Sequence, residues 1–287
     1  MNLRWLLLGF TLALGLALAL PQLLAQDSNA NSELSLGIAA YEKAKYSEAI
    51  DHLERAITVS PKAVAGHFYL AESYDSAYSE ECDWNCDANE RRLVRAIEEY
   101  NKVLELEPSN TEAMKGLAWR YYRAVKSNEA DGFYRRALEV DPNDFEALYT
   151  LAVIQWQRSY QIRAEKRSEL KLGRDKALIN LPSCAEIRSE NLAKVEDGIS
   201  LLTRAAGIVA SYDVKAYLSL LYRERADIEC GDRSAHDQDV NAALEWTRRA
   251  CDAWHKPDRV TISCIAVRCP LPAPPPAGLG QPNGCPD

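Results

Sequence analysis

A recurring pattern of prolines and alanines constrains this chain more than any other feature of its 287 residues. Proline follows a branched apolar residue and one spacer at three places, which are Pro61, Pro108 and Pro142. Small or apolar residues precede each proline in pairs seven residues apart, namely Ala49 and Ala56, Ala96 and Val103, and Ala130 and Ala137. Seven residues are two turns of an α-helix, so each pair lies on one helix face, where small side chains let two helices approach closely. The pattern therefore predicts repeated pairs of helices.

The first helix of each predicted pair carries a large residue followed by a small one, at Leu36-Gly37, Leu70-Ala71, Leu117-Ala118 and Leu151-Ala152. The complete pattern occupies 34 residues from Thr111 to Asp144 without an insertion. This arrangement resembles the tetratricopeptide repeat. The resemblance implies an all-α fold, a right-handed α-solenoid in which helix hairpins stack because one hairpin cannot bury its apolar face alone.

About five hairpins are expected, the last two degenerate, because the pattern weakens after Trp156. Their helices are expected at residues 195–209, 217–226 and 242–254. Compared with the intact copy, about 13 residues are inserted near 76–91, about 34 between 156 and 198, and about 10 between 223 and 243. All three insertions are expected in the turn within a hairpin, and equivalent turns of a solenoid line one edge. The predicted organisation is a solenoid over residues 32–255 and a Pro- and Cys-rich tail over 256–287.

Residues 1–25 have the features of a secretory signal peptide. Arg4 precedes an uncharged apolar run from Trp5 to Leu20, Pro21 ends the run, and Leu23-Leu24-Ala25 follows as an imperfect cleavage site, with Leu23 where a small residue is preferred. The alternative is an uncleaved membrane anchor, although the run is shorter than the ~20 residues of a spanning helix. The sequence therefore predicts an exported protein that is periplasmic, envelope-associated or secreted, with membrane contact only through an uncleaved N-terminus.

The eight cysteines are even in number, and export permits disulfides. Cys184 and Cys230 fall in the insertions of adjacent repeats at the same predicted edge, so a bridge between them is expected. Cys82 and Cys86 are expected to pair within their own insertion, since two thiols make only half of a zinc site. The remaining four are assigned to the tail as a guess: Cys251, Cys264, Cys269 and Cys285. Free buried thiols are the alternative.

Charge and motifs argue against several functions. The net charge of −8, without a basic run, is not typical of a nucleic-acid binder. The four histidines lie in different elements without ligand-like spacing, and no phosphate-binding glycine-rich loop is present. We therefore predict no catalytic site, no metal site and no cofactor.

The resemblance implies that the first helices line a concave groove. Aromatic residues at outward positions of these helices offer contact area for a partner, although several could instead pack against neighbouring repeats. The candidate groove residues are Phe68, Glu72, Asp75, Lys115, Trp119, Tyr122, Tyr149 and Trp156.

The favoured function is a non-catalytic protein–protein interaction adaptor of the cell envelope that binds an extended peptide or a partner helix of unknown identity. One alternative is a carbohydrate-binding or carbohydrate-active protein that stacks sugars on the groove aromatics, with Glu72 and Asp75 as the only local carboxylate pair. Another is a structural envelope protein whose groove is filled by its own tail.

Overall fold

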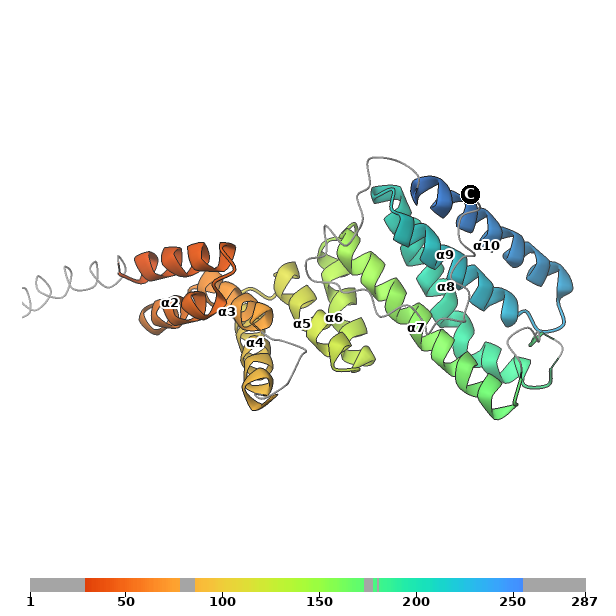
Figure 1. Cartoon of the computed structure of the whole chain (residues 1–287), viewed down its shortest axis with the longest axis horizontal. Helices are drawn as coiled ribbons and strands as arrows, with labels where there is room; N and C mark the ends of the chain where they lie inside the picture. Colours follow the sequence, from red (N-terminus) through yellow and green to blue (C-terminus); the bar gives the residue numbers. More distant parts are fainter. Residues whose placement is uncertain (1–28, 78–85, 173–177, 180, 255–287) are drawn as a thin grey trace, which may run out of the picture. The chain divides into compact units, whose positions relative to one another are not determined.

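The computed structural model describes residues 29–77, 86–172, 178–179 and 181–254, and the regular elements in these ranges are α-helices. The first covers residues 29–42. The helices that follow are α2 (Tyr46–Val59), α3 (Val64–Ser76), α4 (Cys86–Leu106), α5 (Thr111–Arg123), α6 (Ser127–Val140), α7 (Phe145–Glu169), α8 (Cys184–Ile208), α9 (Tyr212–Asp227) and α10 (Arg233–Trp254) (Figure 1). The predicted all-α fold of helix hairpins is confirmed. The predicted signal peptide (1–25) and tail (256–287) lie outside the described residues.

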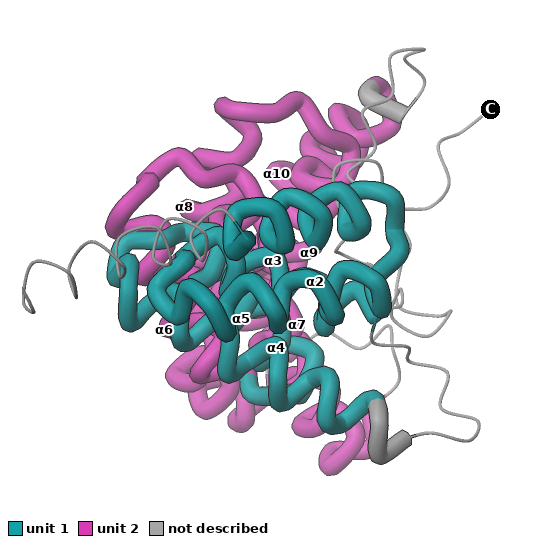
Figure 2. The backbone as a smooth tube through the Cα atoms, turned by 90° about the vertical axis from the view of Figure 1, so that its left-hand side faces the viewer, with its two compact units in different colours: residues 1–126 teal, residues 127–287 magenta. Residues whose placement is uncertain are grey.

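The chain divides into two compact units, residues 1–126 and 127–287, which Figure 2 colours separately. In the first unit α2 packs on α3, α3 on α4 and α4 on α5. In the second unit α6 packs on α7, α7 on α8, α8 on α9 and α9 on α10, and α7 also packs on α9. The last contact joins the first helices of two successive hairpins, as stacking of repeats requires. Within the described residues, no helix has the length and hydropathy that crossing a membrane requires.

The residues that define the repeat form the seams between helices. Ala49, Ala56, Ala130 and Ala137 are at most 1% exposed. The bulky residues of the second helices are also fully buried, and these are Leu53, Tyr100 and Tyr134. Small residues on one helix thus face large ones on its neighbour, which fills the interior at close packing.

Glycine is required where a large side chain lies directly against a helix backbone. A Cβ atom added to Gly116 in α5 would lie 2.5 Å from Cζ of Tyr100 in α4. Gly37 has the same relation to Leu53, at 2.5 Å from Cγ. A glycine therefore sets how closely the helices approach at both places: Gly37 is the small member of the pair Leu36-Gly37, and Gly116 directly precedes the pair Leu117-Ala118.

The first helices of three hairpins are followed, two residues after their last residue, by a residue with left-handed backbone conformation, and these are Ala44 (φ 57°), Val125 (φ 60°) and Lys171 (φ 50°). In each case the next amide donates to the carbonyl five residues earlier, at 2.9–3.0 Å. This pattern satisfies helix-terminal carbonyls, and glycine is the usual residue there. Helix α7 thus ends in the same way as the shorter first helices, although it is about twice as long as α5.

The insertions were predicted to lie in turns, and this was wrong for many of their residues. Helices α7 and α8 have 25 residues each, against 13 and 14 in α5 and α6. Helix α8 begins at Cys184 instead of near Val195, because Cys184, Ile187 and Asn191 continue its buried face. Helices α9 and α10 also begin earlier than predicted, at Tyr212 and Arg233.

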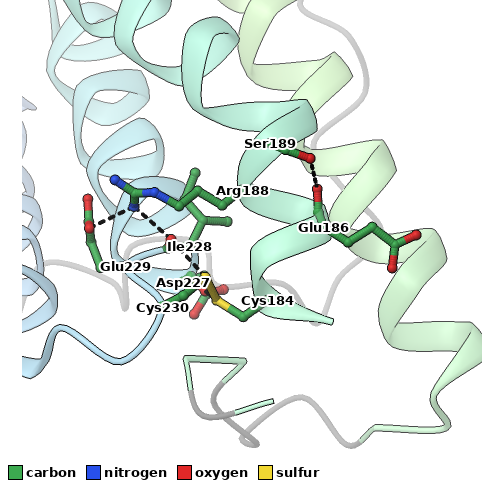
Figure 3. Close-up of a disulfide and its surroundings, with 8 residues drawn as sticks. All are labelled: Cys184, Glu186, Arg188, Ser189, Asp227, Ile228, Glu229 and Cys230. Carbon is green, nitrogen blue, oxygen red and sulfur yellow. Dashed lines mark hydrogen bonds and ion pairs between the residues drawn. A yellow bond between two sulfur atoms is a disulfide. The ribbon is translucent and has the colours of Figure 1, made fainter. Parts of the chain in front are cut away.

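The predicted meeting of adjacent insertions at one edge is confirmed in the second unit. Cys184 and Cys230 form the predicted disulfide, with Cα atoms 5.6 Å apart (Figure 3). Beside it, Nη1 of Arg188 donates to the Ile228 carbonyl at 2.8 Å and to Oε2 of Glu229 at 2.7 Å. The start of α8 is therefore fastened to the segment between α9 and α10.

Cys251 in α10 is also disulfide-bonded. Cys82 and the three cysteines of the tail lie outside the described residues, as does the side chain of Cys86. Their pairing stays a prediction.

Replacing Gly116 with alanine tests the close approach of α4 and α5. Alanine stabilises an open helix site by about 1 kcal/mol relative to glycine. At Gly116 the added methyl would overlap the Tyr100 ring, so we expect a net loss of about 2 kcal/mol. The control is Gly132→Ala, since nothing lies within 4 Å of a Cβ atom at Gly132. Urea denaturation measures the free energy of unfolding of both variants. If both substitutions stabilised the protein, the close contact between Tyr100 and Gly116 would be disproved.

Replacing Cys184 and Cys230 together with serine tests the bridge. The two cysteines are 46 residues apart, so the chain-entropy model predicts a loss of up to roughly 4 kcal/mol in the free energy of unfolding. Chemical denaturation without reductant provides the measurement. Peptide mapping without reduction gives an independent check, and two alkylatable thiols in the native protein would disprove the bridge.

Candidate functional site

The eight predicted groove residues are divided between the two units. Tyr149 and Trp156 belong to the second unit. The first unit contains the other six, which are Phe68, Glu72, Asp75, Lys115, Trp119 and Tyr122. The expectation that residues of α5 and α7 share one groove therefore stays a prediction, and each group is described within its own unit.

The two groove carboxylates of α3 are engaged by other side chains. Glu72 is 1% exposed and accepts hydrogen bonds from the hydroxyls of Tyr41 at 2.9 Å and Tyr100 at 2.6 Å. Asp75 forms an ion pair with Arg120 of α5. Burial raises the pKa of Asp75, and the Arg120 guanidinium opposes that shift without reversing it. Both carboxylates thus tie α3 to neighbouring helices.

The groove residues of α5 are largely buried. Lys115 is 8% exposed and pairs with Glu112 at 2.9 Å. Trp119 is 7% exposed, with the Tyr122 ring centre 5.7 Å away and the Arg123 guanidinium 5.7 Å from its own ring centre. The last predicted residue, Phe68 of α3, is half-buried between aromatic neighbours.

A chain of aromatic rings connects α7 to α9 in the second unit. Phe145 stacks on Tyr149 at 6.1 Å, and Tyr149 meets the edge of Tyr217 at 5.9 Å. Tyr217 in turn contacts Trp156 at 5.3 Å, and Trp156 stacks on Tyr160 at 5.5 Å. The predicted groove residues Tyr149 and Trp156 are only 4% and 5% exposed. They belong to the packing between the helices, and Tyr217 links them.

A buried ion pair continues this chain of rings. Arg163 lies 5.4 Å from the centre of the Tyr160 ring and donates two hydrogen bonds to Glu224, at 2.7 and 2.6 Å. Arg163 also forms an ion pair with Asp227, at 3.1 Å. Burial alone would lower the pKa of Arg163, but the Glu224 carboxylate, assisted by Asp227, raises it above its usual value. The guanidinium therefore stays charged and clamps α7 to α9.

A cleft of about 260 Å³ opens beside this ion pair, between α7, α9 and α10. Tyr160 and Arg163 come from the part of α7 beyond its predicted end, and His236 comes from the early start of α10. The cleft is thus built by the lengthened helices. Besides the ion pair, its walls are formed by Trp156, Tyr160, Leu220, Arg223, His236 and Val240.

Of the residues that line this cleft, only Trp156 was predicted from the sequence, because the residues after Trp156 were expected to form a turn. A signal was present. Trp156, Tyr160 and Arg163 are spaced by four and three residues, which places them on one helix face. Continuing the helical pattern past the predicted end would have found two of the lining residues.

Removing one partner of the buried ion pair should cost more than removing both. Glu224→Ala leaves Arg163 charged and poorly compensated, so we expect a loss of about 3 kcal/mol in the free energy of unfolding. The joint replacement Arg163→Met with Glu224→Leu should cost clearly less, because no buried charge remains. Urea denaturation of the two variants checks this, and a joint loss larger than that of Glu224→Ala would contradict it.

Comparison with known proteins agrees with these repeats. The family model described as the tetratricopeptide repeat matches residues 34–77. Mouse (Mus musculus) sperm-associated antigen 1 is 29% identical over 126 residues, which are 44% of this chain and 12% of that protein. The chain therefore spans only a small part of this relative's length.

Solved structures of MamA share the fold. One MamA structure has a TM-score of 0.50 at 14% sequence identity, covering 78% of this chain and 94% of its own. A second, of AMB-1, has a TM-score of 0.51 at 16% identity, covering 84% and 100%. At such identities the likeness concerns the fold alone. The family model thus identifies a tetratricopeptide repeat at residues 34–77, and the helix hairpins that follow it share their fold with the MamA structures.

Proposed function

We propose that this protein is a non-catalytic adaptor of the cell envelope and binds a segment of a partner protein in the cleft between α7, α9 and α10. The observation that carries the proposal is the cleft itself. Aromatic and aliphatic side chains line it, and the Arg163–Glu224 ion pair fixes one wall. Such sites, in which a buried aromatic region is combined with a few placed polar groups, suit the anchor residues of a protein interface.

The cleft has room for a side chain of a partner, since its volume is about 260 Å³. An apolar side chain of a peptide or partner helix would contact Tyr160, Leu220 and Val240.

The polar groups of the cleft suggest the character of the partner. Glu224 and Asp227 already neutralise Arg163. Arg223 is exposed, and no ion pair to it is formed within the described part of the chain. A partner that presents a carboxylate beside its apolar anchor would therefore complement the site.

The location in the envelope rests on the N-terminal sequence and on the disulfides. Residues 1–25 have the composition of a signal peptide. Disulfides such as Cys184–Cys230 persist mainly in oxidising compartments. Both observations support export, which intact-mass measurement of protein from the native envelope would test.

A carbohydrate ligand is less well supported. Stacking of sugars needs exposed ring faces, whereas Tyr149 and Trp156 are almost fully buried against other rings. The carboxylates considered for sugar chemistry, Glu72 and Asp75, are held by tyrosines and by Arg120. The described contacts thus favour a protein partner.

Charge reversal in the cleft tests the proposal. Once a partner has been captured by crosslinking in the native envelope, Arg223→Glu should weaken its binding at least about tenfold, equivalent to roughly 1.4 kcal/mol. The control is Arg136→Glu in α6, an exposed arginine away from the cleft. Calorimetric titration measures affinity, and circular dichroism verifies the helical content. Equal affinity of Arg223→Glu and the wild type would place the interface elsewhere.

A further inference from the structure

The last described helix, α10, repeats the pattern of α8. Gly198 and Ala205 occupy the small-residue positions of α8, and Ala243 and Ala250 occupy those of α10. In this register Val195 corresponds to Val240, and Ile199 to Leu244. The two helices can therefore be compared position by position.

The corresponding positions differ in burial. Helix α8 packs on both α7 and α9, and its Val195 and Ile199 are 0% and 8% exposed. Helix α10 packs on α9 and is the last helix that the structure describes. Its Leu244 is 55% exposed and its Val240 is half-buried. An apolar stripe that is covered on α8 is therefore left exposed on α10 by the described helices.

Cys251 continues the same stripe. It lies seven residues after Leu244, two helical turns along one face, and it is disulfide-bonded. Since Cys184 and Cys230 bond to each other, the partner of Cys251 is a cysteine whose side chain lies outside the described residues. The candidates are Cys82, Cys86, Cys264, Cys269 and Cys285.

We infer that the segment after α10, residues 255–287, covers the stripe of Leu244 and Cys251, beyond the cleft residue Val240, and is tied to it by a disulfide between Cys251 and a tail cysteine. The segment is close enough, because Leu244 lies ten residues before the end of α10, about 15 Å along the helix. Its first ten residues, up to Cys264, can span about 33 Å when extended.

The composition of the segment fits this role. Val260, Ile262, Ile265 and Val267 supply apolar side chains on both sides of Cys264. The end of a repeat stack needs a cap, since its last apolar face has no further repeat to bury it. A tethered cap made from the chain itself would perform that function, whether or not a partner binds in the cleft.

Peptide mapping of the oxidised, full-length mature protein is the first test. We expect Cys251 to be linked to Cys264, Cys269 or Cys285. A link to Cys82 or Cys86, or a free thiol at Cys251, would overturn the inference.

Limited trypsin digestion is the second test, with cleavage after Arg259 and Arg268 quantified after reduction. Cleavage by protease follows the population of the open state. Leu244→Glu should release the cap and speed this cleavage roughly tenfold, whereas Leu36→Glu, at a leucine 48% exposed, should leave the rate unchanged. A wild-type rate equal to that of Leu244→Glu would show that the stripe is not covered by the tail.

A second copy of the chain is the competing occupant of the stripe. Native mass spectrometry would then show a dimer that Leu244→Glu dissociates without any change in tail cleavage. That result would assign the stripe to self-association and refute the cap. Neither test measures partner binding, so failure of the cap leaves the proposed function of the cleft unaffected.

Discussion

The contact on which the rest of the structure depends is the one between a small residue on one helix and a large side chain on the next. Tyr100 lies directly on Gly116, and Leu53 lies directly on Gly37. In the second unit a Cβ atom added to Gly198 of α8 would lie 2.9 Å from Cδ1 of Leu221 in α9. These contacts set the distance and rotation between helices, and thereby decide which side chains of the first helices can meet.

The second unit shows how this framework can be extended without losing its register. The seam at Gly198 is retained, while α7 and α8 extend beyond it. Arg163 with Glu224 ties α7 to α9, and Cys184 with Cys230 ties α8 to the segment after α9. Each lengthened helix is therefore fixed at two places, at the seam of the original repeat and at a new ion pair or disulfide in its added part. The cleft adjoins the Arg163–Glu224 contact, and α10 forms one of its walls.

Much of the fold could be predicted from the sequence because the repeat depends on residue size at fixed spacing. The seams at Ala49 and Ala130, the hairpin count and the Cys184–Cys230 bridge all follow from that spacing. The starts of α8 and α10 could not be predicted in this way. Counting residues against an intact repeat gives the size of an insertion but not its conformation. The sequence also could not show whether the aromatic side chains face the groove or the interior. Tyr149 and Trp156 occupy groove positions by count, yet Tyr217 of the next hairpin holds them inside, and that contact joins residues distant in sequence.

The lengthening of α7 has a consequence for recognition. Had the inserted residues formed a flexible loop, Tyr160 and Arg163 would have to be ordered at the moment of binding, at a cost of about 0.5–1.5 kcal/mol for each immobilised side chain. On a helix clamped to α9 that ordering is completed during folding. A repeat that gains residues as helix therefore gains preorganised surface, so an insertion can add a recognition site to an old scaffold without adding the entropic penalty of a loop.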